Sequence, residues 1–328
     1  MLRAPQSRTG VLSVIEVLRA GALTTVQDQG RPGFAHLGVP RSGALDPAAL
    51  RLANRLVGNP ASAAGLEITL TGCDLRFSRA ACVALTGAEV EILIDQPPAE
   101  VGRPVGGRPG DGSWWRHRRP GERGRWTDRR PGDVGRPLSL PAGAVLRIGP
   151  TRAGLRTWMA VSGGIDVPPA LGSRATDTLS GLGPPPVRDG DRLPLGEPVG
   201  HPAPVDVTVM PPVPDELRLI LRLGPRHDWF TPAAPDLLFG TAYLVSPVGN
   251  RVGARLTGAA LPRAVTGELP SEGLVLGAVQ VPADGQPLIF LADHPTTGGY
   301  PVVGVVDDVT PLAQARPGTT VTFHGPER

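Results

Sequence analysis

The chain has 328 residues, with 33 arginines and no lysine against 30 acidic side chains, and it contains 44 glycines and 39 prolines. A chain of this length can bury a sizeable core in about two domains. So much glycine and proline argues against a helical bundle and for short strands joined by many turns. No run approaches the roughly 18 apolar residues of a membrane span, and the first residues lack the apolar core of a signal peptide. We therefore expect a cytoplasmic protein.

The cysteines and histidines do not follow a metal-binding pattern. Cys73 and Cys82 are too few for a disulfide framework, and their spacing is not that of a zinc knuckle. The six histidines are scattered, without an HxxxH or HxH pair. We expect buried, reduced thiols and no metal site.

The first half opens with a tail, a strand and a long loop. Residues 1–13 read as a flexible polar tail, and Val14–Leu18 alternates as a strand does. Residues 24–46 are irregular and rich in turn residues, and long loops of this kind are often functional. The alternative is a surface connection held by its own hydrogen bonds. The polar side chains of the loop are Gln27, Asp28, Arg31, His36, Arg41, Ser42 and Asp46.

The clearest predicted helix follows this loop. Asp46 can cap its free N–H groups and Pro47 suits the first helical position, while Gly58 suits the left-handed position after its end. Beyond the helix, Glu67 lies within the strand-like LEITL. Because a buried acid needs a partner, we expect Glu67 to face solvent, an arginine or a ligand. Further strands are predicted around residues 75–77, 82–85 and 90–94.

Residues 99–136 differ from the rest of the chain. Ten arginines lie between Arg103 and Arg136 against four acids, with Trp114, Trp115 and Trp126 among them. Basic and aromatic residues together can bind nucleic acid or an acidic surface, whereas a Gly/Pro/Arg-rich insertion needs no partner. We favour the insertion, and expect no nucleic-acid partner, because no RNA-binding signature is present and the remainder is mildly acidic.

The sequence predicts two domains. Strands at 138–140, 145–148 and 157–161 lead to Gly163-Gly164, a point where backbone can approach closely. Residues 181–216 are dense in proline and glycine, as a linker is. We place a first domain at 14–200, with the insertion at 99–136, and a second at 207–325.

The second half leads to a candidate site. Strands are predicted at 217–223, 239–245, 274–281 and 302–306, with a last short one at 321–323 and a turn at 282–287. The strand Leu288–Leu291 runs into LADHPTTGGYP, residues 291–301, where Gly298-Gly299 can adopt positive φ and present N–H groups. The alternative is an ordinary loop rich in turn residues.

Several long motifs, in this order, resemble one known family. They are TTVQDQGRPGFAHLGVPRSGALDPAALRLANRLVGN, VSGGIDVPPALGSRATD, NRVGARLTG and SEGLVLGAVQVPADGQPLIFLADHPTTGGYP. The sequence is similar to the KipA-like family, which includes the C subunit of bacterial 5-oxoprolinase, the carboxyltransferase part of urea amidolyase and allophanate hydrolase subunit 2. The resemblance runs from Val14 to Phe323 and breaks at 99–136, where the family has a short connection.

This resemblance implies a mainly β fold, with two cyclophilin-like β-barrel domains and a few short helices. It also implies a subunit that acts with a KipI-like B subunit and a separate A subunit in the ATP-dependent hydrolysis of 5-oxoproline to glutamate. Two alternatives stay open: biotin-dependent carboxyl transfer of the urea carboxylase or allophanate hydrolase type, and a non-catalytic regulator that binds a KipI-like protein. Biotin would need a carrier elsewhere, because this chain has no lysine to carry it.

Under the 5-oxoprolinase hypothesis, acids, cations and backbone donors must manage protons and developing negative charge. The chain has no GxxxxGK[ST] loop, so ATP would be held by unfamiliar means or by a partner subunit. We expect loops 24–46, 162–177 and 291–301 to meet around one cleft. The candidate catalytic residues are Asp293, His294, Asp28 and Arg31. The candidate substrate-binding residues are Thr296, Thr297, Gly298, Gly299, Tyr300, Gln27, Ser42, Gly163, Gly164, Arg251 and Arg255.

Overall fold

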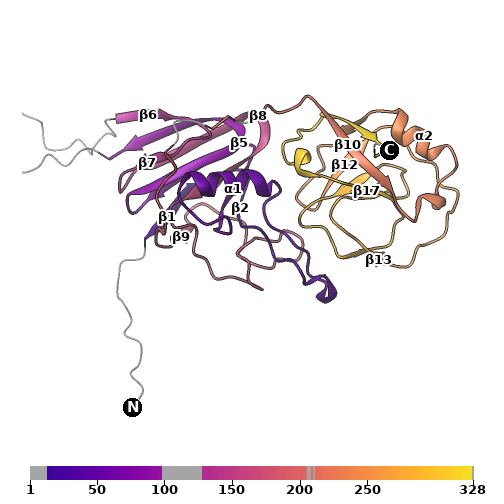
Figure 1. Ribbon diagram of the computed structural model, residues 1–328, viewed down its shortest axis with the longest axis horizontal. Coiled ribbons are helices and arrows are strands. Elements are labelled where there is room, and N and C mark those ends of the chain that lie inside the picture. Colours follow the sequence, from indigo (N-terminus) through magenta and orange to yellow (C-terminus); the bar gives the residue numbers. More distant parts are fainter. Residues whose placement is uncertain (1–12, 98–127, 205–207, 210, 327–328) are drawn as a thin grey trace, which may run out of the picture.

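The computed structural model describes residues 13–97, 128–204, 208–209 and 211–326. These residues form two β structures that lie side by side along the long axis of the molecule (Figure 1). The first β structure is a sheet of nine strands, and the second is a closed barrel of seven.

The first sheet is built from long antiparallel strands. Its main path has the order β2-β3-β8-β4-β1-β9, and β5 pairs with β6, β7 and β8. Buried and outward-facing side chains alternate along β4, which places Cys73, Leu75 and Phe77 in the core. The strands are β1 (Val14–Arg19), β2 (Leu23–Gln27), β3 (Gly65–Thr69), β4 (Cys73–Phe77), β5 (Ala81–Gln96), β6 (Asp128–Gly132), β7 (Leu138–Leu140), β8 (Val145–Val161) and β9 (Arg192–Pro194).

Helix α1 (Pro47–Leu56) lies against this sheet and contacts β5 and β8 (Figure 1). The Asp46 carboxylate accepts a hydrogen bond of 2.8 Å from the Ala49 N–H, which fixes the start of the helix as predicted. Its buried face carries Leu50 and Leu56. Gly58 has φ of +78°, the left-handed conformation expected after the helix end. The packed helix therefore fixes the position of Asp46, the last residue of the loop that precedes it.

The second β structure is closed by a parallel pair. Strand β10 pairs antiparallel with β17 and parallel with β18, so the order β10-β17-β14-β15-β12-β11-β18 returns to its start. Leu217, Leu219 and Leu221 of β10 alternate into the barrel. The barrel strands are β10 (Glu216–Leu223), β11 (Tyr243–Val245), β12 (Gly253–Thr257), β14 (Ala278–Gln280), β15 (Leu288–Phe290), β17 (Val302–Val306) and β18 (Thr320–His324).

Short elements complete the fold. A two-stranded ribbon pairs β13 (Glu272–Gly273) with β16 (Thr297–Gly298). The remaining helical segments are η1 (Ala35–Leu37), η2 (His227–Trp229), α2 (Ala234–Gly240) and η3 (Thr310–Ala313).

One apolar core crosses the interface between the two β structures. Leu50 of α1 and Trp158 of β8 belong to the same buried cluster as Leu291 and Val303 from the second half. Both halves are therefore packed together, which allows loops from each to share a site.

The mainly β prediction is confirmed, but several strands differ. Residues 82–85 and 90–94 were expected as two strands, and both lie in β5, which continues through register shifts around Gly87. Gly87 has φ of +94°, and such a bulge resembles a turn in the sequence. Likewise 145–148 and 157–161 are one strand, β8. The strand expected at 239–245 is wrong in its first part, because residues 234–240 form α2.

Two segments with unusual composition take part in the first sheet. Most of the insertion expected at 99–136 lies outside the described residues, but its segment Asp128–Gly132 forms β6 and pairs with β5. In the stretch 181–216 expected as a linker, β9 pairs with β1, and Val187 and Leu193 are buried. The chain therefore leaves the first sheet later than its proline content suggests.

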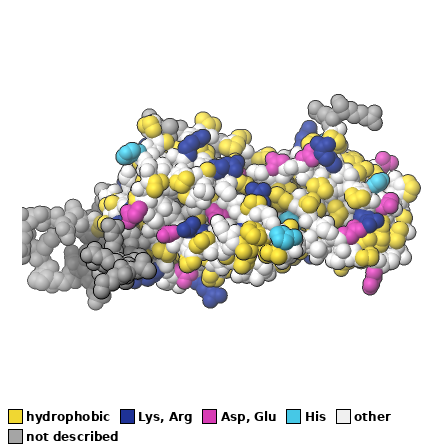
Figure 2. Space-filling model, turned by 60° about the horizontal axis from the view of Figure 1, so that its bottom comes forward, with side chains coloured by type: hydrophobic (Ala, Val, Ile, Leu, Met, Phe, Trp, Pro, Cys, Tyr) yellow, Lys and Arg dark blue, Asp and Glu magenta, His cyan; other side chains and the backbone are white. Residues whose placement is uncertain are grey.

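On the face shown in Figure 2, the charged side chains of the described residues do not form a single patch. Figure 2 shows arginines and acidic side chains interspersed over both halves of one face. No helix of the described chain is long and apolar enough to cross a membrane.

Candidate functional site

A buried network of charges joins the two β structures. The Glu67 carboxylate on β3 accepts a hydrogen bond of 2.5 Å from Nη1 of Arg251, which lies before β12. Arg251 also makes two bonds to Asp293, of 2.9 Å from Nε and 3.0 Å from Nη2. All three side chains are at most 1% exposed. Glu67 thus faces an arginine, which was one of the three partners expected for it.

Glu67 is further held by the first sheet. Its Oε2 accepts hydrogen bonds from the Trp158 indole N–H at 3.0 Å and from the Leu45 backbone N–H at 2.9 Å. Arg251 Nη2 donates to the Gly43 carbonyl at 2.7 Å. These bonds attach the end of loop 24–46 to a side chain of the second half.

Asp293 connects a third segment to the network. Its Oδ2 accepts from the backbone N–H of Thr178 at 3.0 Å and from the Thr178 hydroxyl at 2.7 Å. With four hydrogen bonds from Arg251 and Thr178, Asp293 is a fully paired, buried carboxylate. Its contacts are those of a side chain that orients a site rather than of one that meets a substrate.

The two arginines of the network differ in charge balance. Burial alone would lower the pKa of Arg251, but Glu67 and Asp293 outweigh it, and the pKa lies above its usual value. Arg156 on β8 is also buried, and its Nε lies 3.6 Å from Glu67. For Arg156 the effect of burial outweighs the attraction of Glu67 and lowers the pKa to about 10, and the nearby positive charge of Arg251 lowers it further. Arg156 is therefore the less compensated cation.

Asp28 and Arg31 fix loop 24–46 against residues 170–175. The Asp28 carboxylate accepts from Gly30 N–H, the Ser173 hydroxyl and Arg174 N–H, at 2.8, 2.6 and 2.6 Å. Arg31 donates to the carbonyls of Ala170 and Ala175. The two side chains share this loop without a direct salt bridge, and burial lowers the pKa of Arg31.

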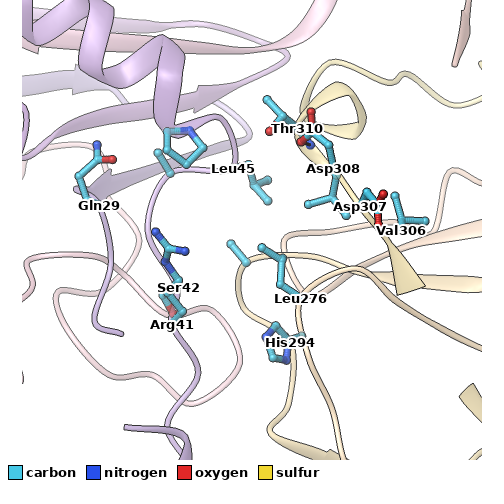
Figure 3. A pocket seen from close by; sticks show the side chains of 14 residues that line it. Gln29, Arg41, Ser42, Leu45, Leu276, His294, Val306, Asp307, Asp308 and Thr310 are labelled. Carbon is cyan, nitrogen blue, oxygen red and sulfur yellow. Dashed lines mark hydrogen bonds between the residues drawn. The ribbon is translucent and has the colours of Figure 1, made fainter. Parts of the chain in front are cut away.

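A pocket of about 140 Å³ opens beside this network, between the two β structures (Figure 3). Ser42 contributes a buried hydroxyl that has no hydrogen-bond partner, and its φ of +51° is unusual for a residue other than glycine. Its backbone N–H donates to the Ala292 carbonyl at 3.0 Å, which binds the loop of the first half to the loop of the second. The lining residues are Gln29, Arg41, Ser42, Ala44, Leu45, Pro47, Leu276, Ala292, His294, Val306, Asp307, Asp308, Val309 and Thr310.

The orientation of His294 fixes its neutral tautomer. Its Nδ1 lies 2.7 Å from the carbonyl oxygen of Pro295, and a carbonyl only accepts hydrogen bonds. Nδ1 must therefore carry the proton, and Nε2 of the neutral ring has a free lone pair. His294 lines the pocket, so it can accept or carry a proton there.

The three loops expected around one cleft are connected by hydrogen bonds, the last of them through the residue that follows loop 162–177, but they do not line one cleft together. Asp28 contacts the loop around residue 173, Ser42 contacts Ala292, and Asp293 contacts Thr178. The pocket itself is lined from loops 24–46 and 291–301 and from residues 306–310, not from 162–177. The first part of the expected loop 24–46 is wrong, because residues 24–27 belong to β2. Gln27 at the end of this strand is buried and donates to the carbonyl of Thr176 at 3.0 Å.

Several candidate residues lie elsewhere. Arg255 points outward from β12, and Gly163 and Gly164 pack against residues 196 and 63–64, where a larger residue at 163 would meet the Gly196 carbonyl. Thr297 and Gly298 belong to the ribbon strand β16. Thr296 lies near Gly38, and Tyr300 is half exposed beneath the guanidinium of Arg263.

Gly298 and Gly299 are not in the left-handed region, contrary to the expectation of positive φ. Position 298 instead requires glycine because of its small size: an added Cβ would lie 2.8 Å from the side chains of Gln280 and Leu274. The sequence also missed Arg156, Asp307 and Asp308. No local motif marks these residues, and they reach the interface only because β8 pairs within the first sheet and β17 within the barrel.

No group of three or more His, Cys, Asp and Glu side chains that could hold a metal ion is found among the described residues. The residues at the pocket also do not suit a nucleoside triphosphate. Arg41 is the one arginine among the described lining residues, and Asp307 and Asp308 face the same space. Because the Asp307 carboxylate is already paired with Arg222, the pocket offers one guanidinium and one further carboxylate, which is little positive charge for a polyphosphate.

Comparison with known proteins gives consistent relatives. The chain is 36% identical to the 5-oxoprolinase C subunit of Escherichia coli, over 94% of this chain and 90% of the relative. It is 30% identical to urea amidolyase of Lachancea kluyveri, over 94% of this chain but 17% of that protein. Among solved structures, the crystal structure of TTHA0988 superposes with a TM-score of 0.77 and 34% identity, over 97% of this chain and 57% of that chain.

The K. lactis urea amidolyase structure superposes with a TM-score of 0.80 at 26% identity, over 98% of this chain and 19% of that chain. These names denote parts of hydrolase or carboxylase systems, and the bacterial relative is one subunit of several. Residues 37–124 and 120–325 match the family described as carboxyltransferase domain, subdomain A and B. The likeness drawn from the motifs is thereby confirmed, and the chain belongs to the carboxyltransferase domain family.

Proposed function

We propose that this chain is the C subunit of a 5-oxoprolinase and acts with A and B subunits in the ATP-dependent hydrolysis of 5-oxoproline to glutamate. The observation that carries the proposal is the match to the bacterial C subunit, which extends over nearly the full length of both chains. The urea amidolyase match, in contrast, covers a small part of a much longer protein.

The pocket between the two β structures supplies groups suited to a small lactam with one carboxylate. Arg41 is exposed and can pair with the carboxylate. The free hydroxyl of Ser42 can bond the lactam amide, and Nε2 of His294 can accept a proton from an attacking water. Behind these residues, the paired charges of Glu67, Arg251 and Asp293 hold both loops in place.

ATP would be bound by another protein of the complex. The pocket does not suit a triphosphate, and the chain lacks the lysine of a P-loop. Under this proposal the chain positions the lactam, and the site is completed by the KipI-like B subunit and the A subunit.

The test is ATP-dependent formation of glutamate from 5-oxoproline by the chain co-expressed with A and B subunits. Arg41→Gln is expected to lower activity by one to two orders of magnitude, since a hydrogen bond between charged groups contributes about 1.5–3 kcal/mol. Arg255→Gln is the matched control, because this arginine is exposed on the barrel and is expected to leave activity unchanged. Equal activity of both variants would remove Arg41 from the site. A stable complex without turnover would contradict the enzyme hypothesis and favour the regulator.

The second candidate is biotin-dependent carboxyl transfer, favoured by the family description and by the urea amidolyase relatives. Because this chain lacks lysine, the assay needs a separate biotinylated carrier together with ATP, bicarbonate and urea. Carboxylation of urea without release of glutamate from 5-oxoproline would favour this function.

A further inference from the structure

A second pocket, of about 250 Å³, opens between the two β structures and shares no lining residue with the first. Arg156 and Arg251 line it, and the other described lining residues include no acid. Arg251 reaches from this pocket to the Gly43 carbonyl, next to Ser42 of the first pocket. The buried charge network therefore borders both pockets.

The two arginines offer different hydrogen-bonding capacity. Each guanidinium nitrogen of Arg251 is bonded, to Asp293, Glu67 or the Gly43 carbonyl. Arg156 bonds the Ala313 carbonyl at 2.9 Å, but its buried Nε has no hydrogen-bond partner. The nearest carboxylate oxygen, Glu67 Oε1, is 3.6 Å away and already accepts from Arg251. The guanidinium of Arg156 is thus nine-tenths buried, it shares its nearest carboxylate with Arg251, and its Nε lacks a hydrogen bond. Burial lowers its pKa to about 10.

The walls of this pocket are mostly apolar. They include Leu70, Leu155, Val245, Leu291 and Leu312. Leu70 is held at φ of +60°, a conformation that costs a residue with a side chain roughly 1–2 kcal/mol. Backbone bonds to Leu155 and Thr151, of 2.9 and 2.8 Å, fix it there, and its side chain remains 42% exposed.

We propose that this second pocket binds a small monocarboxylate with an apolar chain. The carboxylate would pair with Arg156, and the chain would lie against Leu70 and its apolar neighbours. A carboxylate gives Arg156 an acceptor that it does not share with Arg251, and an apolar chain suits walls that offer few polar partners. This inference does not depend on the reaction proposed for the first pocket.

Hexanoate is a suitable probe, with hexan-1-ol and acetate as matched compounds that lack either the charge or the chain. Titration calorimetry or NMR of the full chain is expected to show hexanoate binding roughly tenfold or more tightly than either, the scale of one charge-assisted hydrogen bond or a few buried methylene groups. Hexanoate binding no tighter than hexan-1-ol would overturn the assignment of the carboxylate to Arg156.

Leu70→Gly tests the walls without straining the backbone, because glycine adopts positive φ readily. Leu171→Gly is the matched control, since Leu171 has φ of +51° and is also 42% exposed but does not line the pocket. We expect Leu70→Gly to weaken hexanoate binding about tenfold and Leu171→Gly to leave it unchanged. The same affinity in both variants would overturn the proposal. Arg156→Gln should abolish the preference for hexanoate over hexan-1-ol, and Leu70→Gly remains decisive if that variant does not fold.

Discussion

Glu67 and Arg251 lie 184 positions apart, in different β structures, and form an ion pair that is closed to water. Two buried charges can be accommodated only if each finds its partner with good geometry. The pair therefore fixes how the two halves sit against each other, and with them the loops that line the pocket. Asp293 and Trp158 complete the bonding of the same two side chains.

Arg251→Met is expected to lower the free energy of unfolding by about 3–5 kcal/mol, because it leaves Asp293 buried without its cation and Glu67 with only the longer contact to Arg156. Equilibrium urea denaturation measures this change. Arg255→Met is the control, since Arg255 is exposed four residues further along the chain and should change stability by less than about 0.5 kcal/mol. Equal losses in the two variants would contradict the role of the network.

Ser42→Gly should separate the chemistry of the hydroxyl from the conformation of the backbone. Glycine relieves the positive φ of Ser42 but adds chain entropy, so stability should change by no more than about 1 kcal/mol. Activity of the assembled complex should fall about tenfold, the scale of one hydrogen bond. The control is Leu171→Gly, because Leu171 has the same φ of +51° as Ser42. This variant is expected to leave activity unchanged. Full activity of Ser42→Gly would exclude its hydroxyl from the site.

Local chemistry made part of this structure predictable. Asp46 and Pro47 specify a helix start because capping depends on neighbouring atoms alone. Glu67 required a partner because a charge within an apolar strand cannot be buried alone. The partner itself could not be predicted, since register and barrel closure bring Arg251 to it.

The sequence pattern misplaced features that depend on packing between distant segments. Gly298-Gly299 resembles a flexible turn, yet Gly298 is needed for space beside Leu274 and Gln280. Arg156 looks like any arginine in an alternating strand, and its burial follows from the docking of the barrel. The pocket could be anticipated from the loops of Ser42 and His294, but not its third wall at residues 306–310.

His294→Asn is expected to keep the donor to the Pro295 carbonyl and to remove the group at Nε2. Stability should change by no more than about 1 kcal/mol, whereas activity of the complex should fall about 10²-fold or more, because Nε2 is the atom proposed to accept a proton from the attacking water. In the unmodified chain, ¹⁵N NMR should show the Nδ1-protonated tautomer, as the 2.7 Å bond requires. A ring protonated on Nε2 alone would contradict this assignment.

The two thiols should react slowly in the folded chain. Burial raises the pKa of Cys82 to about 11 and that of Cys73 to about 12. Since the thiolate is the reactive form, alkylation by iodoacetamide at pH 8 should be much slower in the folded protein than in denaturant. Mass spectrometry should find Cys82 modified before Cys73, because Cys73 is fully buried. Rapid labelling of Cys73 under native conditions would show that the first sheet opens.

Asp95 on β5 should contribute stability that depends on pH. It accepts hydrogen bonds of 2.7 Å from Arg129 on β6 and from Arg147 on β8, and Arg147 also pairs with Asp74 on β4. The bond from Arg129 and then that from Arg147 hold the pKa of Asp95 below its usual value, although burial opposes them. A carboxyl whose pKa is lower in the folded state stabilises the fold above its unfolded pKa of about 4. That contribution is lost as pH falls through the folded pKa.

Asp95→Asn is therefore expected to lower the free energy of unfolding at pH 7 by about 1–2 kcal/mol, since both arginines remain partly exposed. The difference from the unmodified chain should shrink below about pH 4 as its own Asp95 becomes protonated. Asp133→Asn is the control, because Asp133 and Arg136 form an exposed pair and should show no such pH dependence. Urea denaturation at pH 7 and at stepwise lower pH measures both variants. If the difference in unfolding free energy between Asp95→Asn and the unmodified chain stays constant with pH, Asp95 acts through its shape rather than its charge.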